Sequence, residues 1–136
     1  MSKNKRILKE FTLFAFVGGI AFVVDVSILY SVKTDIGLYW GRVVSFFCAV
    51  IVTWILNREL TFRRRISDLS MFSEFKKYLT IMIGGGALNY ILYATLLNTM
   101  ENFAFHPIWA VAIGSNAGMI FNFIFLQNTL FSKYRK

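Results

Sequence analysis

The feature that most constrains this chain is the presence of four long stretches without a single charged residue. They are Phe11–Val24, Val43–Asn57, Tyr78–Met100 and Asn102–Ser132. A helix needs about 20 apolar residues to cross a hydrocarbon core ~30 Å thick. The last two stretches reach this length unaided, whereas the first must continue past Asp25 and the second must start near Tyr39. The sequence therefore predicts four transmembrane helices, at about 11–32, 39–60, 78–99 and 107–131.

The composition argues against a soluble fold of the same size. Hydrophobic residues make up 57% of the 136 residues and charged residues only 16%, whereas an average soluble domain carries about 25% charged residues. A soluble four-helix bundle also needs a polar face on every helix, and the third and fourth stretches have none. The predicted fold class is an all-α integral membrane protein.

The basic residues predict how the spans are oriented. The chain carries 15 Lys and Arg against 7 Asp and Glu, and 13 of the 15 lie before the first span, between the second and third, or after the fourth. The positive-inside rule places such segments in the cytoplasm. We therefore expect both termini inside. We expect no nucleic-acid binding, which would need the basic residues on one folded face.

The second half of the sequence repeats the first. A shift of 69 residues superposes Ser45 on Gly114 and Phe62 on Phe131. Because each copy holds two spans, the copies are expected to share one orientation, as parallel repeats. We expect a single membrane domain with a repeat at about 7–62, a cytoplasmic interfacial loop at about 63–77 and a repeat at about 78–131. Residues 66–77 fit either a short helix on the membrane surface or a plain linker.

Small or polar residues recur at every fourth position of the second and fourth spans. They are Gly41, Ser45, Ala49, Thr53 and Asn57 in one, and Ala110, Gly114, Gly118 and Asn122 in the other. This spacing places them along one face of each helix. The stripe predicts either close helix packing, within the chain or between subunits, or the lining of a polar path.

Polar residues inside or beside the spans are the candidates for substrate binding. Asp25 is the outstanding one, because a carboxylate at the centre of a span costs about 2.5–3.5 kcal/mol and such residues usually mark function. Its alternative use is an ion pair with Arg42, which enters span two from the predicted outer side. Asn89 and Asn122 are amides within spans that need hydrogen-bond partners.

Two further candidates, Asn57 and Arg58, close span two at the predicted cytoplasmic face. The Arg58 guanidinium is placed either to bind a lipid phosphate or to anchor the helix at the interface. No nucleophile–base pair, nucleotide-binding motif or metal-ligand spacing accompanies these residues. We therefore expect no catalytic residues, no metal, no cofactor and no enzymatic activity.

Two segments of the chain resemble the GtrA-like family. One runs from Phe11 to Asp25 and contains Val17-Gly18-Gly19, and the other is Trp54-Ile55-Leu56-Asn57-Arg58-Glu59-Leu60-Thr61-Phe62. The second copy, Asn122 to Phe131, is similar, but Leu126 and Gln127 replace the pair Asn57-Arg58. That difference argues against a symmetric second phosphate site.

The resemblance implies a multi-pass protein of the bacterial inner membrane that flips a polyprenyl-phosphate-linked sugar, on a carrier such as undecaprenyl phosphate, for cell-surface polysaccharide synthesis. It also implies membrane glycosyltransferases as partners, beside the membrane lipids. Four helices enclose little volume, so a homo-oligomer is expected. Two alternatives stay open, namely a small proton-coupled multidrug-type transporter and a non-transporting scaffold for a glycosyltransferase.

Overall fold

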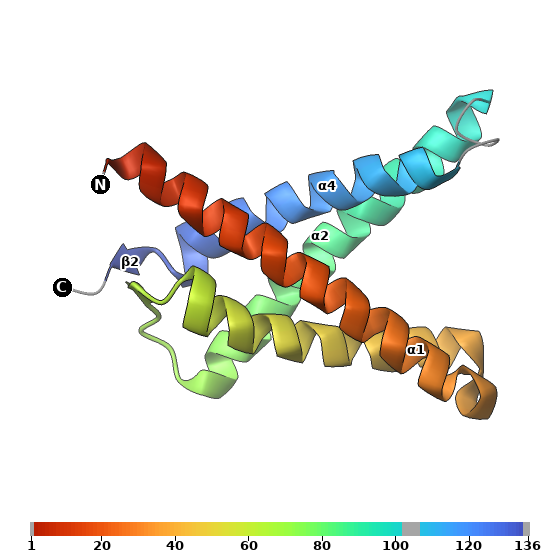
Figure 1. Cartoon of the computed structure of the whole chain (residues 1–136), viewed down its shortest axis with the longest axis horizontal. Helices are drawn as coiled ribbons and strands as arrows, with labels where there is room; N and C mark the ends of the chain where they lie inside the picture. Colours follow the sequence, from red (N-terminus) through yellow and green to blue (C-terminus); the bar gives the residue numbers. More distant parts are fainter. Residues whose placement is uncertain (1, 102–106, 135–136) are drawn as a thin grey trace. The chain divides into compact units, whose positions relative to one another are not determined.

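The computed structural model describes residues 2–101 and 107–134, most of which are helical. They divide into two compact units: unit 1 comprises the residues up to Ile66 together with Tyr134, and unit 2 covers Ser67–Lys133. Each unit contains two helical arms (Figure 1). Each half of the sequence therefore folds as a helical pair of its own.

Unit 1 is built on one long helix that reverses direction. Helix α1 (Lys3–Leu56) begins after Ser2, whose hydroxyl accepts a hydrogen bond from the Lys5 backbone N–H at 3.5 Å. At Gly37 the backbone leaves the helical region, with φ 78° and ψ 170°, a conformation that glycine adopts far more easily than other residues. The first arm of α1, before Gly37, is red to orange in Figure 1, and the second arm returns in yellow.

Unit 2 is a pair of helices, α2 (Met71–Thr99) and α4 (Pro107–Phe125), that pack along each other (Figure 1). Helix α2 begins after Ser70, whose hydroxyl accepts a hydrogen bond from the Ser73 backbone N–H at 3.4 Å. Serine is one of the preferred residues at this position because it satisfies a backbone donor that has no partner inside the helix. Residues 71–77 of the central segment are thus the first turns of α2.

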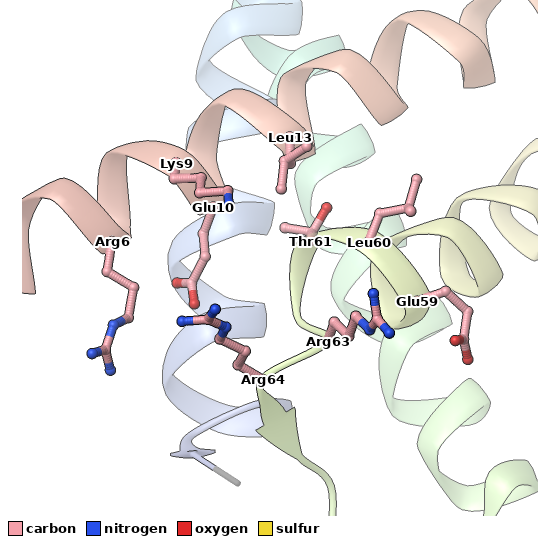
Figure 2. Close-up of a pocket in the computed structure, with 9 residues that line it drawn as sticks. All are labelled: Arg6, Lys9, Glu10, Leu13, Glu59, Leu60, Thr61, Arg63 and Arg64. Atoms are coloured by element: carbon pink, nitrogen blue, oxygen red, sulfur yellow. The ribbon is translucent and has the colours of Figure 1, made fainter. Parts of the chain in front are cut away.

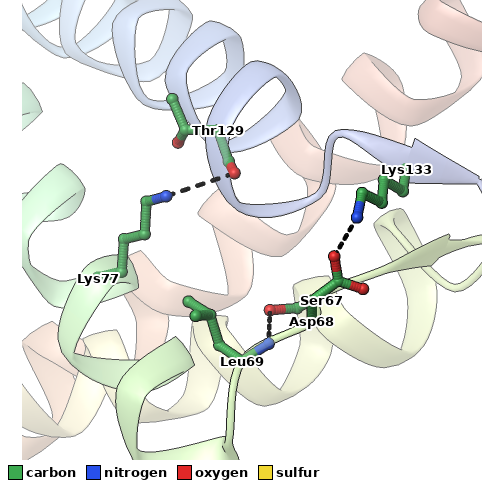
Figure 3. Close-up of polar contacts among 6 residues, drawn as sticks. All are labelled: Ser67, Asp68, Leu69, Lys77, Thr129 and Lys133. Carbon is green, nitrogen blue, oxygen red and sulfur yellow. Dashed lines mark hydrogen bonds and ion pairs between the residues drawn. The ribbon is translucent and has the colours of Figure 1, made fainter.

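Polar contacts order the base of unit 2 (Figure 3). The Lys77 ammonium donates to the Thr129 carbonyl oxygen at 3.4 Å, and Lys133 forms an exposed ion pair with Asp68. The Leu69 backbone N–H donates to the Ser67 hydroxyl at 3.3 Å. Exposed ion pairs contribute little stability, so these contacts mainly fix where the chain enters and leaves the hairpin.

Both units end in the same uncommon turn, a five-residue π-helix. These are η1 (Asn57–Thr61) and η2 (Leu126–Leu130), and the short strands β1 (Arg65–Ile66) and β2 (Lys133–Tyr134) follow them. The Phe62 backbone N–H donates to the Asn57 carbonyl at 2.8 Å, and Phe131 donates likewise to Leu126 at 2.9 Å. Both phenylalanines are buried. The two turns begin 69 residues apart, so the predicted repeat extends to this local geometry.

The outer faces of the helices are apolar, as in a protein surrounded by lipid. Three segments of the described residues are long and apolar enough to span a membrane, and only 11%, 28% and 12% of their most apolar windows are buried. They are Lys3–Gly37, Val43–Thr61 and Met71–Leu96. The fourth predicted span corresponds to α4 with η2, which lies in the charge-free stretch 102–132. The predicted fold class, an all-α integral membrane protein, is confirmed.

Candidate functional site

The stripe of small residues on the second arm of α1 forms a buried face. Its five members, Gly41, Ser45, Ala49, Thr53 and Asn57, are all buried, whereas the apolar residues between them include exposed Val43, Phe47, Ile51 and Ile55. A Cβ placed on Gly41 would lie 3.2 Å from the Leu29 side chain on the first arm. Within unit 1 the stripe therefore serves helix packing, as small residues do where backbones approach closely in lipid.

The same stripe brings a polar group to Asp25. The Ser45 hydroxyl donates a hydrogen bond to Asp25 Oδ1 at 2.6 Å, which joins the two arms of α1 within their apolar segments. Asp25 is half-buried and Ser45 is fully buried. Arg42 lies in the second arm, but its side chain is outside the described part of the structure. The ion pair between Asp25 and Arg42 stays a prediction.

Unit 2 has a related arrangement around Asn89, which lies 64 residues after Asp25. The Asn89 side-chain amide donates to the Ser115 hydroxyl of α4 at 3.4 Å. A Cβ on Gly114 would lie 2.6 Å from the Asn89 backbone oxygen, so this glycine is required for α4 to approach α2. Each unit thus has a hydrogen bond between its two arms, made by a carboxylate in unit 1 and by an amide in unit 2.

Asn122, the last polar member of the stripe on α4, points at the backbone of α2. A Cβ on Gly85 would lie only 2.0 Å from Asn122 Oδ1. That oxygen is buried and has no hydrogen-bond partner among the described residues. A buried acceptor without a partner is unfavourable by about 1–3 kcal/mol. Asn122 is therefore a polar position that packing alone does not explain.

The structure places Asn57 inside its own turn. Its side chain is fully buried, and its Oδ1 accepts a hydrogen bond from the Thr61 hydroxyl at 2.7 Å. Its backbone carbonyl receives the π-helical bond from Phe62. Arg58, the next residue, is half-buried. The motif that carries the family resemblance thus contains the groups that shape η1, which sequence spacing alone did not reveal.

A buried ion pair, which we did not expect from the sequence, joins the two ends of unit 1. Arg65 in β1 donates from Nε and Nη2 to the two carboxylate oxygens of Glu10, at 3.0 and 2.7 Å, and the two side chains are only 4% and 7% exposed. This two-point geometry is the strong form of an arginine–carboxylate contact. It holds the segment after η1 against the start of α1.

A pocket of about 330 Å³ lies beside this ion pair (Figure 2). Four basic side chains line it, those of Arg6, Lys9, Arg63 and Arg64. Glu10 and Glu59 line it as well, and Glu10 is the carboxylate neutralised by Arg65. The basic residues appeared in the sequence only as a topology signal, because a charge run does not reveal which helix end it will meet. We call this cavity the basic pocket.

The comparisons with known proteins agree with this architecture. A family model described as the GtrA/DPMS transmembrane domain matches residues 13–135. The chain belongs to this family. Comparisons with curated proteins and with solved structures gave no match.

The GtrA/DPMS match covers most of unit 1, all of unit 2 and both π-helices. All six candidate residues fall inside it, namely Asp25, Arg42, Asn57, Arg58, Asn89 and Asn122. The basic pocket lies across its boundary, because Arg6, Lys9 and Glu10 precede the matched residues while Arg63 and Arg64 belong to them. Part of the pocket is therefore built from a segment that precedes the matched GtrA/DPMS region.

Proposed function

We propose that this GtrA/DPMS protein translocates a polyprenyl-phosphate-linked sugar across the bacterial inner membrane. It acts as a transporter and not as an enzyme, in the synthesis of cell-surface polysaccharide. The observation that carries the proposal is the pair of polar contacts inside apolar arms, Asp25 with Ser45 and Asn89 with Ser115. Burying polar groups within membrane spans is energetically unfavourable, and such groups commonly line substrate pathways.

The chemistry of these groups suits a sugar headgroup. Carboxylate, amide and hydroxyl groups exchange hydrogen bonds with sugar hydroxyls, which need such partners when they leave water. The outward apolar side chains, such as Phe47 and Ile51, suit the prenyl tail, which stays in lipid. Asn122 Oδ1, which is buried without a partner among the described residues, offers one more acceptor.

The distribution of basic residues is the basis for the proposed direction of transport, from the cytoplasmic side outward. With both termini and residues 63–77 in the cytoplasm, in accord with the positive-inside rule, the basic pocket faces the side on which a membrane glycosyltransferase makes the lipid-linked sugar. Such an enzyme is the proposed partner. Because each unit is only a pair of helical arms, we propose that more than one copy assembles to form the path.

Reconstitution tests the proposal. Purified protein is placed in liposomes with a fluorescent polyprenyl-phosphate sugar in both leaflets, and an impermeant quencher is added outside. Protein-free liposomes lose only the outer-leaflet signal, whereas active protein exposes the inner pool as well. Absence of flux, both alone and together with a membrane glycosyltransferase, would contradict the proposal and favour a scaffold. Proton-driven efflux of a cationic dye would favour a multidrug-type transporter.

A variant of Asp25 sharpens this test. Asp25→Asn removes the charge but keeps an oxygen that can accept the Ser45 hydrogen bond. We expect the flux rate to fall about five- to tenfold, since a sugar hydroxyl gains about 1.5–3 kcal/mol from a charged acceptor and only about 0.5–1.5 kcal/mol from a neutral amide oxygen. The control is Ser31→Ala on the same arm, where an exposed hydroxyl donates to the Ser27 carbonyl of its own helix at 2.8 Å. Full flux in a folded Asp25→Asn protein would exclude this role for Asp25.

A further inference from the structure

We infer that the basic pocket of unit 1 binds the phosphate group of a lipid headgroup. The inference deepens the proposed function and rests on it for the identity of the lipid, a polyprenyl phosphate with or without its sugar. The site differs from the sequence candidate, Asn57 with Arg58, because neither residue lines the pocket.

The charge balance of the pocket favours an anion. Four cationic side chains line it against two carboxylates, and Arg65 compensates Glu10 from within the protein. Of the remaining lining residues, Lys9, Arg63 and Arg64 are cations and Glu59 is the one further carboxylate. A phosphate group supplies the missing negative charge. Arginine is the side chain best suited to it, because its planar fork can donate two parallel hydrogen bonds to phosphate oxygens.

The buried ion pair between Glu10 and Arg65 positions the cationic side chains of the pocket in advance of binding. Arg65 directly follows Arg63 and Arg64, and its two hydrogen bonds to Glu10 hold this short segment against the first arm of α1. Glu10 in turn directly follows Lys9 and lies one turn after Arg6. Two segments that are far apart in sequence therefore present their cations to one cavity. A ligand binds more tightly where its partners are already positioned.

The apolar part of the lining points to a lipid and not to a soluble anion. Leu13 and Leu60 belong to the lining beside the charged side chains, with Leu60 next to Arg63 and Glu59 (Figure 2). Leu13 is in the arm that continues as the first membrane span. A molecule that carries both a phosphate group and a hydrocarbon chain can use both kinds of lining residue. The volume of about 330 Å³ is within the usual range for ligand pockets.

The test is a binding measurement that needs no transport. Full-length protein in nanodiscs of neutral lipid is titrated with polyprenyl phosphate, with unphosphorylated polyprenol and with inorganic phosphate. We expect saturable binding of polyprenyl phosphate, weakened by salt, and none of polyprenol. Competition by inorganic phosphate would show that the phosphate group alone is recognised. Lack of competition would show that the hydrocarbon is required as well. Equal binding of polyprenol and polyprenyl phosphate would overturn the inference.

Paired variants locate the binding. Arg63→Gln with Arg64→Gln should weaken polyprenyl phosphate binding about tenfold or more, because each lost contact is a charge-assisted hydrogen bond. Lys3→Gln with Lys5→Gln removes the same charge from exposed positions of α1 that do not line the pocket, and should change binding little. Arg63→Lys with Arg64→Lys restores charge without the fork and should recover part of the affinity. Equal weakening in the Arg→Gln and Lys→Gln pairs would show a diffuse surface effect and overturn the site.

The two proposals fail in different ways. Tight binding that depends on Arg63 and Arg64, without flux in liposomes, would contradict transport and leave the pocket intact. Flux that persists with unchanged binding after Arg63→Gln and Arg64→Gln would overturn the pocket and leave transport intact. These variants leave the Glu10–Arg65 ion pair in place, so circular dichroism should confirm that they fold.

Discussion

Substitution of Gly118 by alanine tests the packing of unit 2 most directly. A Cβ at this position would lie 2.6 Å from the Gly85 carbonyl oxygen, and real Cβ atoms essentially never come closer than 3.0 Å to a neighbour. The clash is with backbone, so no side-chain rotation relieves it, and α4 has to move away from α2. The displacement also loosens neighbouring contacts, including those of Asn89 with Gly114 and Ser115.

The expected loss of stability follows from this geometry. Overpacking a well-packed interface by one methyl group costs about 1–3 kcal/mol, and every ~1.4 kcal/mol is a factor of ten in an equilibrium constant. Gly118→Ala should therefore shift the unfolding equilibrium toward the unfolded state by about 5- to 150-fold. Gly86→Ala is the matched control on α2, because a Cβ there meets nothing within 4 Å. It should be neutral or slightly stabilising, since alanine favours helix by roughly 0.5–1 kcal/mol.

The assay is equilibrium unfolding in mild detergent mixed with increasing denaturing detergent, followed by circular dichroism. We expect the midpoint of Gly118→Ala to fall well below that of the wild type and the midpoint of Gly86→Ala to stay close to it. Equal midpoints for the two variants would refute the close approach of α4 to α2 at Gly85. A shift confined to Gly86→Ala would refute it as well.

Two further substitutions test unit 1. Glu10→Gln should destabilise the protein by about 3–5 kcal/mol, since it leaves the buried Arg65 charge without its counter-ion; a thermal-unfolding midpoint within error of the wild type would contradict the buried ion pair. Gly37→Ala should cost about 1–3 kcal/mol, because φ 78° and ψ 170° are strained for a residue with a Cβ. Gly19→Ala, where a Cβ meets nothing within 4 Å, is its control in the same unfolding experiment, and equal stability would show that the turn at Gly37 imposes no strain.

The helices and the repeat were predictable because they depend on residues that are close to one another in the sequence. A charge within the hydrocarbon core is so unfavourable that its absence over about 20 residues marks a span. The stripe of small residues from Gly41 to Asn57 was visible for a similar reason, since a spacing of four returns to one helix face. The start of α2 at Met71 was less apparent, although Ser70 is a favourable N-cap residue.

The basic pocket was not predictable, because it depends on which chain ends meet. Glu10 and Arg65 are 55 residues apart, and nothing in the spacing of Arg63, Arg64 and Arg65 indicates a carboxylate partner. The positive-inside rule predicts on which side of the membrane these arginines lie, but it predicts no contact. For Asn57 the sequence suggested a ligand site where the structure shows a local structural role. An amide before an arginine at the end of a span fits a ligand site. In the structure, however, the Asn57 side chain accepts a hydrogen bond from Thr61 within η1.

The turn at Gly37 has a consequence for how the protein is made. Only one residue of α1, Gly37, departs from helical geometry. The turn that closes this hairpin is therefore short, and its formation costs little chain entropy. Contacts between the two arms, such as that of Asp25 with Ser45, join residues only 20 positions apart in the sequence. Low contact order favours rapid folding. We therefore expect unit 1 to leave the ribosome and enter the membrane as a preformed hairpin. The ion pair between Glu10 and Arg65 can form only after Arg65 has been synthesised, 55 residues later. We therefore expect it to be one of the last contacts in this unit to form.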